Sequence, residues 1–273
     1  MNRHDLSCPI CNFTAVKIFL SKHKREIFEC QSPECGHFFT PPTFEMQGVC
    51  KRPQSIEEES NNFFTQYDER NQRLWSLFEK KILGAKKPFV LLDFGAGNAH
   101  ISRSIKNTLK DGGIIYCLEK NPYCNGLYSR FGLKEVHDLL EINEPISLVY
   151  MVEVIEHLEF PVEILESLQR VFEPSTQLFI STPCGAKNEN ITTAFDTPSH
   201  LHFFTEKSLN LALTISGFNR IVYSNIEELA PRPSKISIKQ VIKNILMKFN
   251  PNYIFNRNKK NIHLAGFTTI INN

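Results

Sequence analysis

The stretch from Val90 to His100 reads Val-Leu-Leu-Asp-Phe-Gly-Ala-Gly-Asn-Ala-His, and it decides the fold class. Its apolar start is typical of a strand buried on both faces, and a helical pattern begins after it. Gly95 and Gly97 lie between the two, where the backbone must turn sharply and approach a ligand. A dinucleotide fingerprint would place a third glycine where His100 stands, so the turn does not indicate a pyrophosphate site.

Apolar runs of strand length alternate with helical patterns along the rest of the chain, for example at 100–109 and 162–172. Such alternation predicts parallel pairing, and we expect an α/β fold with a doubly wound, mostly parallel, seven-stranded Rossmann-like sheet. The expected strands are Phe89–Asp93, Ile114–Leu118, a short run near Val136, Ile146–Met151, Gln177–Ser181, Phe218–Tyr223 and His263–Ile271.

Three acidic residues follow the order expected along the ligand-binding edge of such a sheet. Asp93 precedes the glycine turn, Glu119 ends the second strand, and Asp138 follows the third. The carboxyl ends of parallel strands share one edge, where a carboxylate can accept hydrogen bonds from ribose hydroxyls. Glu119 suits that role and Asp138 could accept from an adenine amino group, although an exposed loop carboxylate is the alternative for each acid alone.

Leu92-Asp-Phe-Gly-Ala-Gly97 and the acid at the end of the second strand resemble the class I S-adenosylmethionine-dependent methyltransferases. The resemblance covers approximately residues 55 to 273. It implies S-adenosylmethionine as cofactor, with Gly95 and Gly97 facing its methionine part, Glu119 at the ribose and Asp138 near the adenine. Asp93, within the first motif, is counted with these cofactor residues. Asn98-Ala-His departs from the family, which often has another glycine there.

A second constellation, Glu153-Val-Ile-Glu156-His157, follows the fourth strand. On a helix, Glu156 and His157 would share one face with Glu153, and two carboxylates with an imidazole suit a divalent metal. A fourth ligand could come from His200 or His202 after the fifth strand. The alternative is that the acid and the histidines only hydrogen-bond their own loops.

The same residues resemble ubiquinone-biosynthesis O-methyltransferases and small-RNA 2′-O-methyltransferases. That resemblance implies Glu153, Glu156, His157 and His202 as ligands of magnesium or another divalent metal beside the acceptor hydroxyl, with His200 as the competitor. Without metal, His157 or His202 could act as general base. Glu153, His157 and His202 are therefore the expected catalytic residues.

The amino-terminal segment carries two cysteine knuckles, Cys8-Pro-Ile-Cys11 and Cys30-Gln-Ser-Pro-Glu-Cys35. Two such turns can supply four thiolates to a closed tetrahedral site, so we predict a structural zinc ribbon. Four unrelated thiols are the alternative. The expected organisation is a ribbon at 1–45, a linker with capping helices at 46–84, and a catalytic domain at 85–273.

The formal net charge of the 273 residues is +2, but residues 231–260 contain eight basic residues and no acid. This basic insertion, bounded at 229–260, has apolar residues near helical spacing. It could be a solvated helix on the sheet edge, a contact for an anionic membrane surface, or a contact for a phosphate-bearing substrate. No hydrophobic signal segment or membrane-length apolar run is present, so we expect a cytoplasmic protein.

The zinc ribbon beside Glu-Val-Ile-Glu-His also resembles bacterial methyltransferases that act on sugars. We therefore expect methyl transfer to a hydroxyl of a small-molecule or glycan-type acceptor. The alternative is an RNA methyltransferase acting on a 2′-hydroxyl or a ribosomal base, since one such family also joins a zinc ribbon to this fold. RNA is the less favoured partner because strong positive charge is confined to the insertion. A non-catalytic module that recruits a partner through the ribbon is a further hypothesis.

Overall fold

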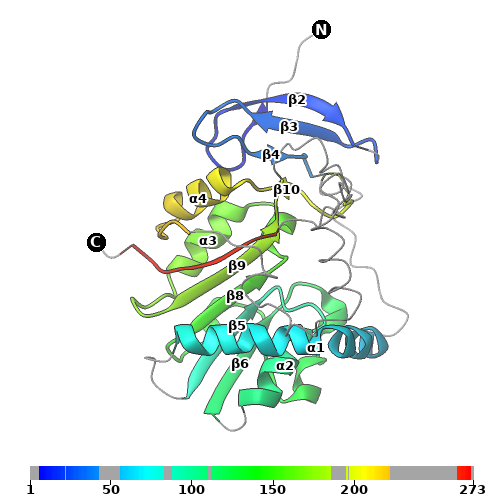
Figure 1. Ribbon diagram of the computed structural model, residues 1–273, viewed down its shortest axis with the longest axis vertical. Coiled ribbons are helices and arrows are strands. Elements are labelled where there is room, and N and C mark those ends of the chain that lie inside the picture. The colour runs from blue at the N-terminus through cyan, green and yellow to red at the C-terminus, as the bar shows by residue number, and fades with distance from the viewer. Residues whose placement is uncertain are drawn as a thin grey trace, which may run out of the picture.

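The computed structural model describes residues 6–21, 23–42, 56–82, 88–109, 112–185, 195, 197–221 and 263–271. These residues form two sheets. A six-stranded sheet has the order β11-β9-β8-β5-β6-β7, and a five-stranded sheet with the order β1-β2-β3-β4-β10 lies above it (Figure 1).

The six-stranded sheet is parallel except for its edge strand β11. Its strands are β5 (Phe89–Phe94), β6 (Gly113–Leu118), β7 (Lys134–Val136), β8 (Leu148–Val152), β9 (Gln177–Pro183) and β11 (His263–Thr268). All six residues of β5 are buried, as expected for a strand covered on both faces. The carboxyl ends of β5, β6 and β8 meet at one edge of the sheet, which is where the predicted cofactor residues lie.

Alternate residues of these strands face two separate apolar cores. Leu91 and Tyr150 pack with α1 (Ile56–Lys81) and α2 (His100–Leu109). Leu92 and Met151 pack with α3 (Pro161–Gln169) and α4 (Glu206–Ile215). Because successive side chains of a strand point to opposite faces, helices on both faces follow directly from these fully apolar strands. The described residues also form short 3₁₀ helices, namely η2 (Pro122–Cys124), η3 (Tyr128–Phe131), η4 (Leu139–Glu141) and η5 (Ile155–His157).

The ribbon sheet contains β1 (Leu6–Ser7), β2 (Thr14–Leu20), β3 (Glu26–Cys30) and β4 (Phe38–Phe39). Its fifth strand, β10 (His202–Phe203), comes from the far end of the chain and pairs with β4 in antiparallel fashion. The segment expected as a ribbon, 1–45, thus contains β1 to β4, whereas β10 lies outside that segment. The ribbon sheet is completed by a strand that leads into α4 of the catalytic domain.

The doubly wound α/β fold is confirmed, with one difference in the number of strands. Among the described residues the main sheet has six strands instead of seven. Phe218 forms only an isolated bridge to Ile270, and the last two residues of the expected strand 218–223 lie outside the described part. The basic insertion at 229–260 lies outside it as well. In the described part, no helix combines the length and apolar character needed to cross a membrane.

Candidate active site

The glycine turn after β5 uses backbone conformations that favour glycine. Gly95 has a φ of +75° and Gly97 a φ of +49°. Two hydrogen bonds fix the turn. The Gly95 amide donates to the Leu118 carbonyl at 2.8 Å, and the Tyr128 hydroxyl donates to the Gly97 carbonyl at 2.9 Å. A Cβ on Gly97 would meet no atom within 4 Å, so the space beside this residue is open to a ligand.

Glu119 lies directly against this turn. Its Oε2 accepts a hydrogen bond from the Gly97 amide at 2.8 Å, and its Oε1 accepts from the Asn121 amide at 2.8 Å. The carboxylate predicted to hold a ribose is therefore fixed at the carboxyl end of β6, beside the open space. Asp138 is exposed at the end of β7, where its Oδ1 accepts from the Leu140 amide at 2.8 Å and caps η4.

Asp93, also predicted as a cofactor residue, lies at the end of β5 with its side chain turned to α2. It is only 4% exposed, and its Oδ2 accepts a hydrogen bond from the Ser102 hydroxyl of α2 at 2.5 Å. Tyr150 shares this buried network through a 2.7 Å hydrogen bond with Ser102. Burial raises the pKa of Asp93 to about 7. Asp93 therefore ties β5 to α2 behind the glycine turn.

The acid and histidine loop after β8 adjoins the glycine turn. A Cβ built on Gly95 would lie 2.6 Å from Val154 Cγ1, so the Val154 side chain fills the space that a side chain at Gly95 would need. The preceding residue, Glu153, has a φ of +59°, a strained conformation for a residue with a side chain. Its Oε1 accepts from the Ser181 hydroxyl at 2.9 Å. The expected continuous helix is thus replaced by a left-handed turn and the short η5.

Glu156 is buried within this loop. It is 1% exposed, and its Oε2 accepts from the Thr182 hydroxyl at 3.0 Å. Its Oε1 accepts no hydrogen bond from the described residues and lies 4.0 Å from His157 Nε2. Burial, followed by the nearby charge of Glu153, raises the pKa of the Glu156 carboxyl well above its ordinary value.

The structure brings Glu156, His157 and His200 together, with one ligand atom of each within 4.8 Å of the others. The rings of His157 and His200 meet edge to face with centroids 4.7 Å apart. His157 Nδ1 lies 2.9 Å from the Ser199 carbonyl, which can only accept, so Nδ1 carries the proton. Nε2 of His157 is therefore the basic nitrogen of a neutral ring, and it faces the carboxyl of Glu156.

His202, which the sequence predicts as a metal ligand or base, lies outside this group. Its Nε2 lies 2.8 Å from the Leu158 carbonyl and its Nδ1 lies 3.0 Å from His37 Nε2, so both ring nitrogens are occupied. The residue is 3% exposed, and burial lowers its pKa to about 4. His200 meets the His157 ring instead, because it stands in the turn before β10, where its amide donates to the Thr197 carbonyl at 3.2 Å.

A protein-family model described as "Methyltransferase domain" matches residues 64–223, which is more than half of the chain. The chain belongs to this methyltransferase family. The prediction of an S-adenosylmethionine-dependent methyltransferase is thereby confirmed. A search of curated protein sequences found no match.

Several solved structures share the fold of this methyltransferase at low sequence identity. The plantazolicin methyltransferase BamL, in complex with a triazolic desmethylPZN analogue and SAH, is 8% identical, with a TM-score of 0.55 over 83% of this chain and 94% of that one. A complex of the Haloferax volcanii Trm112 methyltransferase activator with a putative methyltransferase gives 13% identity and a TM-score of 0.50 over 80% and 99%. The mitomycin 7-O-methyltransferase MmcR gives 14% and 0.50 over 64% and 55%. At these identities the similarity concerns the fold alone.

The four knuckle cysteines of the methyltransferase converge as their spacing predicts. Their sulfur atoms all lie within 4.8 Å of one another. Cys8 Sγ and Cys35 Sγ are 3.8 Å apart, and Cys11 Sγ and Cys30 Sγ are 3.5 Å apart. Ligands placed tetrahedrally at about 2.3 Å from a zinc ion are roughly 3.8 Å apart, so the four sulfurs fit a closed zinc site. Burial raises the pKa of the Cys30 thiol to about 12, and a bound cation would oppose that shift.

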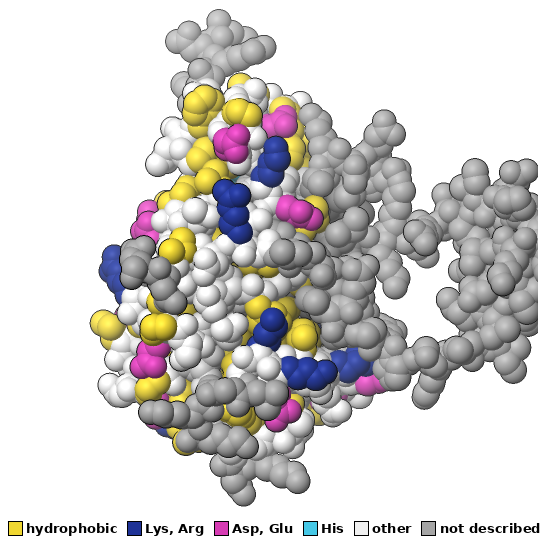
Figure 2. All heavy atoms as spheres, turned by 60° about the vertical axis from the view of Figure 1, so that its left-hand side comes forward, with side chains coloured by type: hydrophobic (Ala, Val, Ile, Leu, Met, Phe, Trp, Pro, Cys, Tyr) yellow, Lys and Arg dark blue, Asp and Glu magenta, His cyan; other side chains and the backbone are white. Residues whose placement is uncertain are grey.

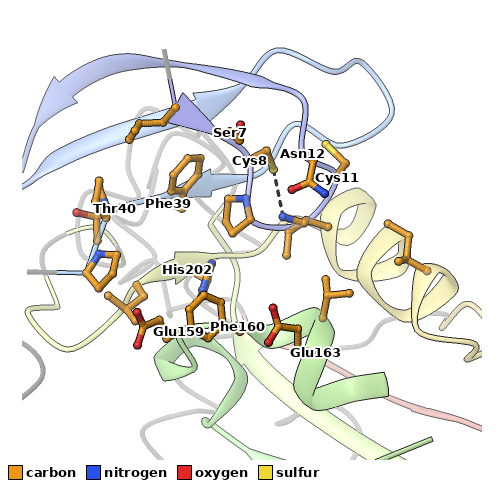
Figure 3. A pocket seen from close by; sticks show the side chains of 18 of the residues that line it. Ser7, Cys8, Cys11, Asn12, Phe39, Thr40, Glu159, Phe160, Glu163 and His202 are labelled. Carbon is orange, nitrogen blue, oxygen red and sulfur yellow. Dashed lines mark hydrogen bonds between the residues drawn. The ribbon is translucent and has the colours of Figure 1, made fainter. Parts of the chain in front are cut away.

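A cavity of about 650 Å³ lies between the first knuckle and the start of α3 (Figure 3). Glu159, Phe160 and Glu163 form one side of it, and the turn from Ser7 to Asn12 forms the other. His202 contributes to its wall, but none of its lining residues belongs to the glycine turn or to the Glu156, His157 and His200 group. The cavity is therefore separate from the edge where methyl transfer is expected.

Proposed function

We propose that this methyltransferase transfers a methyl group from S-adenosylmethionine to a hydroxyl oxygen of a small-molecule or glycan-type acceptor. The observation that carries the proposal is the contact between Gly95 and Val154. It joins the cofactor turn to the loop that holds Glu156 and His157, so the sulfonium methyl and a proton acceptor would meet at one edge of the sheet.

The chain supplies what methyl transfer to a hydroxyl requires. A sulfonium methyl is already electrophilic, so the enzyme has to align the acceptor and remove its proton. His157 can accept that proton at Nε2, because the Ser199 carbonyl holds the other proton on Nδ1 and fixes the ring. The His157 side chain is 37% exposed, so an entering acceptor can reach it.

A divalent cation fits the same group. Glu156 offers a buried oxygen that accepts no hydrogen bond from the described residues, and His157 and His200 offer nitrogens nearby. These three residues would hold the cation, which would occupy His157 Nε2 in place of a proton, and Glu153, which Ser181 binds, would lie beside them. When bound, a divalent cation would lower the pKa of an acceptor hydroxyl and orient its oxygen.

Charge supports a small or glycan-type acceptor over RNA. On the face shown in Figure 2, the basic side chains of the described residues lie singly or in small groups among acidic and hydrophobic ones. An enzyme that binds the RNA backbone generally presents positive charge over a wider surface.

A label-transfer screen tests the proposed function. The purified protein is incubated with S-adenosylmethionine carrying a labelled methyl group and with phenols, catechols, sugar nucleotides or RNA. We expect label on a hydroxyl of a phenol or sugar, and at least a tenfold loss of rate in His157→Gln. His137→Gln is the matched control, because His137 is exposed and its Nε2 lies 3.7 Å from Glu135 Oε1. Label on RNA alone would overturn the proposal.

The cation is tested in the same assay. We expect a chelator to abolish transfer and magnesium or manganese to restore it, with no restoration in Glu156→Gln. Full activity in the presence of the chelator would reject the cation and leave His157 as the sole proton acceptor.

A further inference from the structure

The ribbon contacts the candidate active site through one buried cation, Arg25. This residue follows the turn between β2 and β3 and is 9% exposed. Two hydrogen bonds close this turn. The Ser21 amide donates to the Arg25 carbonyl at 2.9 Å, and the Arg25 amide donates to Ser21 Oγ at 3.2 Å. The guanidinium therefore projects from a fixed point of the ribbon.

The Arg25 guanidinium donates to four backbone carbonyls of the segment that ends at His200. Nη1 donates to the carbonyls of Pro198 at 3.0 Å and His200 at 2.7 Å. Nη2 donates to those of Phe195 at 3.1 Å and Thr197 at 2.7 Å. A planar guanidinium presents its donors in a rigid fork, so it fixes the carbonyls relative to one another as well as to the ribbon.

The same short segment is attached on its other side to the acid and histidine loop. The Ser199 carbonyl accepts from His157 Nδ1 at 2.9 Å, and the Leu201 amide donates to the Glu156 carbonyl at 2.8 Å. The Leu201 carbonyl in turn accepts from Thr40 of the ribbon at 2.9 Å. Residues 197–201 thus lie between the ribbon and η5, and β10 continues from them into the ribbon sheet (Figure 1).

We propose that Arg25 is a positioning residue for the active site, and that the ribbon forms the support of its acceptor side. By holding the carbonyls on both sides of Ser199, Arg25 presents the Ser199 carbonyl to His157 and places the His200 ring against it. The ribbon then acts in catalysis without contacting the cofactor. The catalytic meaning rests on the proposed function, whereas the effect on His157 is independent of it.

The test uses the His157 ring as its probe, in the full-length protein without acceptor. Nitrogen-15 NMR of selectively labelled histidine reports which ring nitrogen carries the proton. Wild type is expected to show His157 protonated on Nδ1, and Arg25→Lys is expected to shift it to a mainly Nε2-protonated ring. A lysine keeps the charge, but a single ammonium cannot bind four carbonyls in a fork. Lys17→Gln is the matched control, because Lys17 lies on the same hairpin, is half exposed and pairs with Glu26.

Two measurements separate a local effect from unfolding. Zinc content and affinity for S-adenosylhomocysteine should stay within twofold of wild type in Arg25→Lys. Arg25→Gln, which buries no charge, is the second variant if the lysine disrupts the ribbon. The wild type offers a check that needs no substitution. Four donated hydrogen bonds predict separate, slowly exchanging Nη signals for Arg25, in contrast to the exposed Arg170.

An unchanged His157 ring in a folded Arg25 variant, or averaged Nη signals for Arg25 in wild type, would overturn the inference. Where the screen supplies an acceptor, Arg25→Lys should lower kcat at least tenfold and leave KM for S-adenosylmethionine unchanged. If no acceptor is labelled but the His157 ring still changes, the proposed function fails and the positioning role stands.

Discussion

His37 Nε2 donates a hydrogen bond to His202 Nδ1 over 3.0 Å, and this bond joins the ribbon to the catalytic domain. Its direction follows from the neighbours. His202 Nε2 must carry a proton because it binds the Leu158 carbonyl at 2.8 Å, so Nδ1 of the neutral ring accepts. His37 Nδ1 then accepts from the Ser208 hydroxyl at 3.2 Å. Both rings are buried, so this chain requires two neutral imidazoles.

Acid should therefore weaken the fold through His202. Burial lowers its folded-state pKa to about 4, whereas an unfolded histidine titrates near 6.5. Between these values the unfolded chain binds more protons, so stability falls as the pH is lowered through this window. Over the same window we expect the free energy of unfolding of His202→Gln to fall by on the order of 2 kcal/mol less than that of wild type. Urea unfolding between pH 7 and pH 4.5 measures this, and parallel pH curves for the two proteins would contradict it.

The cysteine cluster should bind one zinc ion per chain. Its four sulfurs already lie within 4.8 Å of one another, and a segment this small folds with the help of its metal. Elemental analysis should find zinc in wild type and little in Cys11→Ser combined with Cys30→Ser. Cys184→Ser is the matched control, because this cysteine lies near the knuckles but outside the cluster. Equal zinc in both variants would reject the site.

Glu119 and Asp93 should differ in their effect on cofactor affinity. Glu119 binds the Gly97 amide beside the open space, whereas Asp93 is buried against Ser102. We expect Glu119→Gln to weaken binding of S-adenosylhomocysteine at least tenfold, or about 1.4 kcal/mol. Asp93→Asn should keep that affinity and change mainly the melting temperature. Calorimetric titration measures both affinities. A larger loss of affinity in Asp93→Asn than in Glu119→Gln would show that Asp93 belongs to the cofactor site.

Position 95 should tolerate no side chain unless the side chain of Val154 is shortened. An alanine there would adopt a φ of +75° and place its Cβ 2.6 Å from Val154 Cγ1. The left-handed backbone alone costs about 1 kcal/mol, and the collision adds to it. We expect Gly95→Ala to lose S-adenosylhomocysteine binding and Val154→Ala in the same chain to restore part of it. If the second substitution restores nothing, the steric account of this contact fails.

The periodicity of the chain was enough to predict the main sheet. Strands at 89–94, 113–118, 148–152 and 177–183 agree with the apolar runs, because a strand covered on both faces has to be apolar throughout. The glycine turn and the convergence of Cys8, Cys11, Cys30 and Cys35 were also predictable, since both depend on short spacings along the chain.

Contacts between distant segments decided the rest of the site. His202 lies in β10, and the pairing of β10 with β4 places it against His37 of the ribbon, whereas His200 stands in the turn before β10 and meets His157. The burial of Asp93 likewise depends on tertiary packing. So do the hydrogen bonds of Arg25, whose partner Phe195 is 170 residues away in the sequence. The sequence by itself determined the elements and the types of chemical groups, because these follow from local propensity and spacing. Only the tertiary structure decided which of those groups meet, because nonlocal pairing between strands and loops leaves no periodic signal in the chain.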